Sequence, residues 1–439
     1  MYAIFLNKIL LPIGSILFSG NYSSYLRKWE RYDGMDASSL DKIQKSKLTE
    51  ILAYSRENVP YFRNLNLPHN APLEDFPVLT KSILRTETDA LISDKYKKEK
   101  LDKNYSSGSS GEQSFTYMTH EHKFFLRALQ THWWKWGGYN PGDFLIQTGI
   151  SPKRTLPKKL KDFFFRTLYL EAFTLRTNSI KKALHRSENK TPKHLAGYPS
   201  ALNEIALIAI EENKSYEFKS LISYGDKLFQ HFEKNYKLAF QNPTIVNTYG
   251  CAEGLHMACK IDLPYYYIMS PHVYLEIVDD NNNPLKDGER GHILVTCLTN
   301  KAMPIIRYKL GDLGILLPRS KYPKNMRFNY PILKEITGRE TDVIRAPNGD
   351  TLLLHSFTGI MEYFIEIKQF KVIQTSKDTL LIEYITDTNK KIPKSTELLI
   401  LRKFGELLSN SMEVSFQLVK EIVASPSGKP QIIEIRKTD

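Results

Sequence analysis

The apolar residues between positions 114 and 250 alternate between strand-like and helix-like patterns. Short apolar runs bounded by turn residues predict strands at 114–119, 144–150, 194–199, 219–224 and 244–249. Apolar residues at helical spacing predict helices at 121–136, around 179–184, at 200–212 with Ser200 as its cap, and at 226–240, whereas the basic stretch between 150 and 179 is expected to form loops. Strands that alternate with helices in this way predict an α/β domain with a largely parallel sheet, whose ligands gather at the C-terminal ends of the strands.

The chain has other patterns on either side of this region. Helices are expected at 26–61, with one apolar face at 40–52, and at 81–88. Two strands at 273–278 and 292–298, separated by a turn-rich connection, predict a small β unit, and two helices at 356–367 and 395–408 alternate with short strands after residue 338. The predicted fold class is therefore α/β. A large N-terminal domain at 1–338 has mostly parallel sheets flanked by helices plus the small β unit, and a small α+β C-terminal domain occupies 339–439.

The first twenty residues are strongly apolar and leave three alternatives open. Lys8 interrupts the apolar run, and Pro12 and Gly14 break a helix, whereas a membrane-spanning helix needs about 20 mostly apolar residues. A helix packed on the protein's own core is favoured. A peripheral membrane foot and a span or signal segment are the alternatives.

The charge and cysteine content of the chain say more about where the protein is located than about what it binds. The chain has 439 residues and a formal net charge of +13, but its Lys and Arg residues are spread along the sequence. Basic clusters at 95–100, 153–161 and 181–186 are typical of solvated surfaces, and no zinc-finger spacing or RNA-binding aromatic signature accompanies them, so no nucleic acid partner is expected. An odd count of 3 cysteines fits a reducing compartment, so the expected location is cytoplasmic, with a membrane-peripheral position as the alternative. His256, Cys259 and His272 invite a zinc interpretation, but their spacing matches no standard closed site, and ordinary packing is favoured.

A loop of Ser and Gly residues follows Tyr105 and ends at Gly111. Glycines let the backbone approach a ligand closely, and successive N–H groups and hydroxyls can converge on phosphate oxygens. The loop is not a Walker A motif, because no lysine follows Gly111. By itself it fits either a flexible connection or a phosphate cradle.

Further motifs follow this loop in a recognisable order. They are Ser106-Ser107-Gly108-Ser109-Ser110-Gly111, Gly197-Tyr198-Pro199-Ser200, Tyr249-Gly250-Cys251-Ala252-Glu253-Gly254, Arg307-Tyr308-Lys309-Leu310-Gly311-Asp312, Gly338-Arg339-Glu340-Thr341-Asp342 and Ser427-Gly428-Lys429. With these motifs the chain resembles the adenylate-forming ligases, and within them the phenylacetate-CoA ligase family, including its branch associated with capsular polysaccharide synthesis. The resemblance runs from about residue 79 to the C-terminus.

This resemblance implies an ATP-dependent, Mg²⁺-dependent enzyme that activates a small carboxylic acid as acyl-AMP. The acyl group would pass to coenzyme A or to an amine or hydroxyl acceptor of sugar type, and the C-terminal domain would be a mobile lid. The implied site residues are Ser106, Ser107, Gly108, Ser109, Ser110 and Gly111 for the phosphates, Tyr249 and Gly250 for adenine, Asp312 for ribose, Glu253 for magnesium, Arg339 for ribose or phosphate, Lys429 for the α-phosphate, Tyr198 for the wall of the acyl pocket and Asp342 for the hinge of the lid.

The chain departs from the family pattern at three positions, and two other functions remain as alternatives. The lysine that usually follows the phosphate loop is missing, and Lys309 and Leu310 stand where the family usually has Arg and Thr. A catalytically degenerate homologue that binds nucleotide without turnover is therefore one alternative. A basic protein that interacts with membrane surfaces or nucleic acid is the other.

Overall fold

The structure is a computed structural model that describes most of the chain. The described residues are Tyr2, Leu6, 21–105, 115–149, 154–172, 175–214, 216–225, 228–251, 253–337, 344–348, 351–352, 354–361, 363–364, 366–386, 388–408, 411–422 and 433–436. The chain groups into two compact units. The first comprises Met1–Asn104, Phe115–Gly142 and Thr244–Gly338, and the second comprises Tyr105–Ser114, Asp143–Pro243 and Arg339–Asp439. The division into domains at residue 338 stays a prediction.

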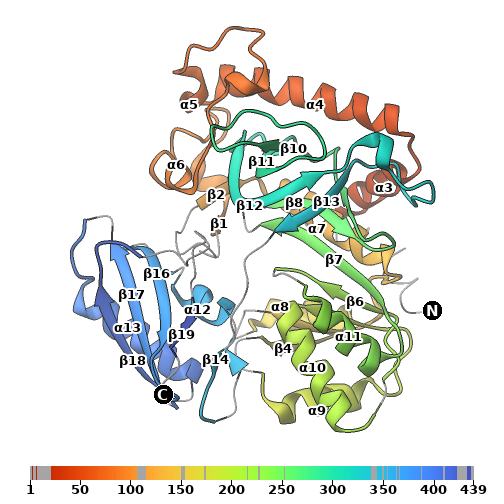
Figure 1. Cartoon of the computed structure of the whole chain (residues 1–439), viewed down its shortest axis with the longest axis vertical. Helices are drawn as coiled ribbons and strands as arrows, with labels where there is room; N and C mark the ends of the chain where they lie inside the picture. Colours follow the sequence, from red (N-terminus) through yellow and green to blue (C-terminus); the bar gives the residue numbers. More distant parts are fainter. Residues whose placement is uncertain are drawn as a thin grey trace. The chain divides into compact units, whose positions relative to one another are not determined.

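The α-helices of the first unit that the structure describes in full lie between residues 22 and 136. They are α3 (Tyr22–Asp33), α4 (Ala37–Asn58), α5 (Pro60–Arg63), α6 (Lys81–Thr86) and α7 (His120–Trp136), with short 3-10 helices at Leu73–Asp75, Lys98–Lys100 and Arg319–Lys321 (Figure 1). The stretch expected to be helical at 26–61 is confirmed as helical and is divided among three helices, α3, α4 and α5. Gly34 ends the first piece, and Asp36 starts the next, because its side chain accepts a hydrogen bond of 2.7 Å from the backbone N–H of Ser39.

The strands of the first unit form an antiparallel run with a separate two-stranded sheet. Neighbours in the run are β10 (Val273–Val278), β11 (Arg290–Cys297), β12 (Tyr308–Leu316), β13 (Ile332–Thr337), β9 (Tyr266–Ile268), β8 (Leu255–Lys260) and β7 (Thr244–Cys251). The hairpin expected at 273–298 is confirmed, but the β unit around it is larger than predicted. The separate sheet pairs β1 (Asp102–Tyr105) with β2 (Phe115–Met118), so the Ser/Gly loop connects two paired strands.

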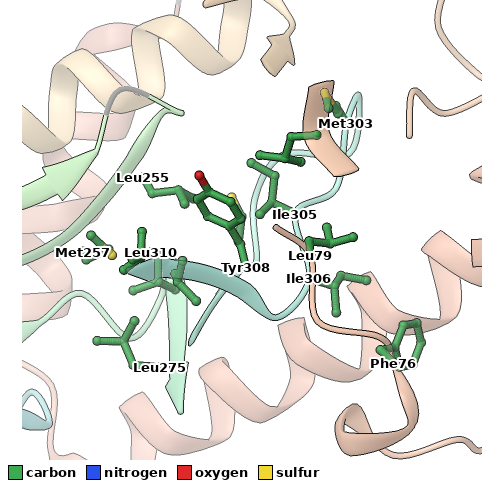
Figure 2. Close-up of a cluster of buried hydrophobic side chains, with 14 of the residues drawn as sticks. Phe76, Leu79, Leu255, Met257, Leu275, Met303, Ile305, Ile306, Tyr308 and Leu310 are labelled. Atoms are coloured by element: carbon green, nitrogen blue, oxygen red, sulfur yellow. The ribbon is translucent and has the colours of Figure 1, made fainter. Parts of the chain in front are cut away.

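The core of the first unit collects apolar side chains from segments far apart in the sequence. Figure 2 shows Phe76 and Leu79, which precede α6, next to Ile306, and the same cluster includes Ile305 and the ring of Tyr308. All five are at most 1% exposed. The segment that carries the Arg-Tyr-Lys-Leu-Gly-Asp motif is therefore anchored in the core at its N-terminal end.

The stretch Asp143–Pro243 contains the expected parallel strands. Their order is β6 (Ser220–Ser223), β5 (Lys193–Gly197), β3 (Phe144–Gly149) and β4 (Thr167–Glu171), all in parallel pairs. The helices are α8 (Leu156–Phe164), α9 (Thr177–Ser187), α10 (Pro199–Glu211) and α11 (Gln230–Phe240). The prediction of basic loops between 150 and 179 is wrong, because α8 and β4 lie there. Ser200 is not the cap of α10, which begins at Pro199 after Tyr198 and has no side-chain cap.

Residues 344–435 form a small α+β arrangement with a hydrophobic core of its own. Its sheet has the order β18 (Glu413–Leu418), β17 (Thr379–Thr386), β16 (Ile367–Gln374) and β19 (Ile433–Ile435), and β14 (Ile344–Arg345) pairs with β15 (Thr351–Leu352). Of its helices, α13 (Lys394–Leu408) is close to prediction. The other, α12 (Leu354–Met361), ends earlier than expected because Ile367 already begins β16 (Figure 1). The α/β fold class is confirmed.

No helix among the described residues is long and apolar enough to cross a membrane. The alternatives for residues 1–20 concern a segment that lies outside the described residues apart from Tyr2 and Leu6.

Candidate active site

A tight turn between β7 and β8 carries Glu253. Gly254 has φ +87°, a conformation that favours glycine, and a Cβ there would lie 2.6 Å from Cε of Met118. A Cβ on Gly250 would lie 2.7 Å from the backbone oxygen of Leu255. The two glycines of the motif are therefore required for this turn.

The side chain and the backbone of Glu253 are both held by neighbouring strands. Glu253 is only 4% exposed, and its Oε1 accepts a hydrogen bond of 2.9 Å from the hydroxyl of Tyr308. Its backbone oxygen accepts a bond of 3.2 Å from Oγ1 of Thr116, on β2. Thr116 therefore ties β2, the strand that follows the Ser/Gly loop in the sequence, to the turn that carries the glutamate.

A bulge in β12 sets the direction of Asp312. His292 of β11 pairs with Leu313 and Leu294 pairs with Lys309, so extra residues of β12 leave the ladder, and Gly311 among them has φ +89°. Bulges of this kind are common beside active sites, where they redirect a side chain. The sequence motif supplies the glycine that this conformation favours.

Asp312 is held by the other motif. The hydroxyl of Tyr249 donates a hydrogen bond of 2.9 Å to Oδ2 of Asp312. Burial, followed by the nearby Asp312 carboxylate, raises the pKa of Tyr249 well above its usual value, so this tyrosine stays a hydrogen-bond donor. Each motif thus provides one carboxylate and one tyrosine, and each tyrosine binds the carboxylate of the other motif.

Arg307 anchors this arrangement, and the sequence analysis assigned it no role. Its Nε donates to Oε1 of Glu276 at 3.1 Å, and its Nη atoms donate to the backbone oxygens of Glu74, Phe76 and Asn282 at 2.9 to 3.1 Å. Arg307 itself has φ +50° and is 4% exposed. The only feature of the sequence that could have pointed to Arg307 is its position directly before Tyr308. For Thr116, the only such feature is its position shortly after the Ser/Gly loop.

The described carboxylates fit a magnesium ion that is bound mainly through nucleotide phosphates. Mg²⁺ in nucleotide sites is usually held by one or two carboxylates plus phosphates and water, not by an all-protein cage. Glu253 offers such a carboxylate, fixed by Tyr308. Within the described part of the chain, no group of three or more His, Cys, Asp or Glu residues could hold a metal ion, so His256, Cys259 and His272 do not form the zinc site considered as an alternative.

Tyr198 lies at the C-terminal ends of the parallel strands in the second unit. Its ring is 5.7 Å from that of Tyr224, measured between centroids, and the Tyr224 hydroxyl donates to the backbone oxygen of Thr148 at 2.9 Å. Gly225 has φ +88°, and a Cβ there would lie 2.4 Å from the Tyr198 ring. Ligands of open α/β sheets bind at this end of the strands, so the position suits the predicted wall of an acyl pocket. That role stays a prediction.

Several predicted site residues lie outside the described residues. They are Ser106, Ser107, Gly108, Ser109, Ser110 and Gly111 of the loop, Arg339, the hinge residue Asp342, and Lys429. Their roles stay predictions.

Parts of the chain match known proteins in sequence. Residues 344–436 match the CapK C-terminal domain. Phenylacetate-coenzyme A ligase of Escherichia coli (strain K12) is 37% identical over 106 residues, or 23% of each chain, and that of Aromatoleum evansii is 40% identical over 104 residues, or 23% of this chain and 22% of the relative. The matched part thus spans less than a quarter of the length of these relatives.

Solved structures match nearly the whole chain. 2-Hydroxyisobutyryl-CoA ligase with 2-HIB-AMP and CoA in the thioesterification state has a TM-score of 0.60 and 17% identity, and the match covers 92% of both chains. An open conformation of this ligase has a TM-score of 0.56 and 18% identity, over 91% of this chain and 92% of that one. The predicted resemblance is therefore confirmed: the chain has the acyl-CoA ligase fold, resembles the phenylacetate-CoA ligases among the adenylate-forming ligases, and matches the CapK C-terminal domain at residues 344–436.

Proposed function

We propose that this protein is an adenylate-forming ligase. It activates a carboxylic acid with ATP as acyl-AMP and transfers the acyl group to coenzyme A or to an amine or hydroxyl acceptor. The observation that carries the proposal is the crossed pair of contacts in the first unit, in which Tyr308 holds Glu253 and Tyr249 holds Asp312 at 2.9 Å each. Two carboxylates fixed in this way suit two different parts of a nucleotide.

The two carboxylates have different chemical tasks in this proposal. Bound with ATP, Mg²⁺ would be held by Glu253 and would neutralise charge on the phosphates. Asp312 would accept hydrogen bonds from the ribose hydroxyls, since a carboxylate has about four lone-pair sites and Tyr249 occupies one of them. Catalysis of such transfers depends on positioning and charge stabilisation, which rigid carboxylates provide.

The remaining assignments rest on the sequence motifs. The loop at 106–111 would hold the β- and γ-phosphates, Arg339 would bind ribose or phosphate, and Lys429 would reach the α-phosphate from a lid that turns about Asp342. Tyr198 would line the acyl pocket. The finer proposal is that the acceptor is of sugar type and that the enzyme serves surface polysaccharide synthesis. It rests on the resemblance of the sequence motifs to the capsule-associated branch of the family.

ATP–pyrophosphate exchange across a panel of aryl, fatty, hydroxy and amino acids tests the proposal. We expect Mg²⁺-dependent exchange with one class of acid, and its loss in Glu253→Gln, because an amide is a far weaker magnesium ligand than a carboxylate. Tight ATP binding without exchange for any acid would instead support the degenerate nucleotide-binding alternative. Unchanged exchange in Glu253→Gln would refute the assignment of the metal ligand.

A further inference from the structure

The short helix α8 exposes its apolar residues and buries a charged one. The exposed fractions of Leu156, Leu160, Phe163 and Phe164 are 79%, 56%, 76% and 39%. Asp162 is the one buried residue of α8, all of whose residues the structure describes. This is the reverse of the pattern of a helix that packs on a protein core.

The four apolar residues share one face. At about 100° per residue, positions 156, 160, 163 and 164 fall within an arc of about 100°, and Asp162 lies on the opposite side. Adjacent exposed phenylalanines are rare on surfaces that face only water, and contiguous apolar patches mark interaction sites. The rings of Phe163 and Phe164 lie 5.8 Å apart in an edge-to-face arrangement, so they form one continuous apolar surface.

A buried ion pair fixes the rotation of α8. Arg154 donates from Nε and Nη2 to the two carboxylate oxygens of Asp162 at 2.8 and 2.6 Å, and its guanidinium lies 3.9 Å from the centroid of the Tyr169 ring on β4. Turning the apolar face inward would expel Asp162 from this pairing and leave Arg154 without its charged partner, which is costly for buried ions. The ion pair therefore orients the apolar face away from Arg154 and from β4.

Lysines flank the apolar face on both sides. Lys159 and Lys161 are exposed and fall roughly 90° to either side of the centre of the apolar arc. Such side chains extend their charged ends toward lipid headgroups while their alkyl stems lie along apolar surface. The combination of an apolar stripe with bordering cations is typical of helices that lie in the plane of a membrane interface.

We propose that α8 is a docking surface for an anionic lipid bilayer. The apolar side chains enter the boundary between headgroups and acyl chains, and Lys159 and Lys161 contact anionic headgroups. Charge complementarity favours this occupant over a second copy of the chain, because a two-fold contact through this face would place the lysines of one copy against those of the other. The surface uses residues of α8 and none of the predicted site residues, so it does not rest on the proposed ligase activity.

Co-sedimentation of the full chain with vesicles tests this surface. We expect binding to vesicles of phosphatidylcholine with phosphatidylglycerol, weaker binding to phosphatidylcholine alone, and a decline with added salt. The double variant Leu160→Ser, Phe163→Ser is expected to lower the apparent affinity for vesicles by about tenfold or more. It removes apolar side chains that are exposed in the free protein and become buried in the bilayer on binding. The matched control is Leu238→Ser on α11, where a leucine that is 72% exposed is removed far from α8 in the sequence.

Three results would overturn the proposal. They are no binding of the wild-type chain to anionic vesicles, equal binding of the double variant, and equal binding to neutral vesicles. Loss of a dimer by size-exclusion chromatography in the double variant, without vesicle binding by the wild type, would identify a second copy as the occupant instead. Because the substituted side chains are exposed, equal melting temperatures of the variants are the check that the fold is intact.

Discussion

Mild acid is expected to destabilise this protein through buried histidines near the glutamate turn. His122 on α7 and His256 on β8 have ring nitrogens that are buried without a hydrogen-bond partner among the described residues. Burial lowers the pKa of each from 6.5 to about 4, and the proximity of His256 contributes at His122. His272 lies in the same region, and burial lowers its pKa well below the usual value.

The magnitude follows from the difference in protonation between the folded and unfolded chains. Between pH 6.5 and about 4 the unfolded chain binds protons on these rings and the folded chain does not, so the free energy of unfolding falls as the pH falls through this range. At about pH 5, each of the two rings lowers the free energy of unfolding by about 2 kcal/mol relative to neutral pH, and the two together lower it by about 4 kcal/mol. Typical domains have a total stability of about 5–15 kcal/mol, so this loss is large.

Urea unfolding at about pH 7.5 and about pH 5 measures this loss, and substitutions assign it. His122→Leu removes one titrating ring, so the difference between the two pH values should shrink by about 2 kcal/mol, whatever the substitution costs at both. The matched control is His69→Leu, the same change at a histidine whose side chain is exposed. Carboxylates such as Glu121, whose pKa is lowered by hydrogen bonds from Tyr25 and Asn21, lose their contribution only at lower pH. An equal pH difference in wild type and His122→Leu would refute the reasoning.

Four further predictions concern the site and the element that positions it. Tyr308→Phe removes the hydrogen bond to Glu253 and should raise the Mg²⁺ concentration needed for pyrophosphate exchange about tenfold or more, because a hydrogen bond to a charged group contributes about 1.5–3 kcal/mol. The control is Tyr249→Phe, which should not change the Mg²⁺ requirement. Asp312→Ala should weaken ATP binding by about 1.5–3 kcal/mol in calorimetric titration, with acid binding unchanged, and equal ATP affinity would contradict the ribose assignment. Arg307→Met should lower the free energy of unfolding by about 3–5 kcal/mol, because Glu276 would be left as a buried charge without its partner; a change under 1 kcal/mol in urea would show that the pair is not stabilising. Lys429→Ala should slow adenylation about 10²- to 10³-fold yet still transfer acyl from preformed acyl-AMP, and equal loss of both half-reactions would rule out a lysine that acts only in the first.

The parallel strands β3, β5 and β6 and the motif turns could be read directly from the sequence, whereas the parallel strand β4 could not. Buried parallel strands are continuous apolar runs, which is why β3, β5 and β6 were located within a residue or two. A Cβ would collide at Gly250, and φ is positive at Gly254, so both positions favour glycine. Such a requirement is visible as a glycine in the sequence, without knowledge of which other residues lie nearby. The order of the motifs then indicated which family the chain resembles, and the comparisons confirmed this resemblance and the fold.

The antiparallel strands β8, β9, β12 and β13 and the contacts within the site needed the tertiary structure. The sequence of β12, Tyr-Lys-Leu-Gly-Asp-Leu-Gly-Ile-Leu, contains two glycines and an aspartate, so its strand depends on pairing with β11 and β13 and not on local preference. The sequence did not predict α8, because its basic residues are typical of a loop and its apolar residues are exposed instead of packing on a core.

The sequence by itself therefore determined the chemical groups, the turn glycines and the class of fold, because these depend on residue type and on near neighbours. Only the tertiary structure decided that Tyr249 holds Asp312 and that Tyr308 holds Glu253, because each bond joins residues more than fifty positions apart. Spacing along the chain contains no information about such distances. They are set by the register of β12 and by its bulge at Gly311, which pairing with a neighbouring strand defines.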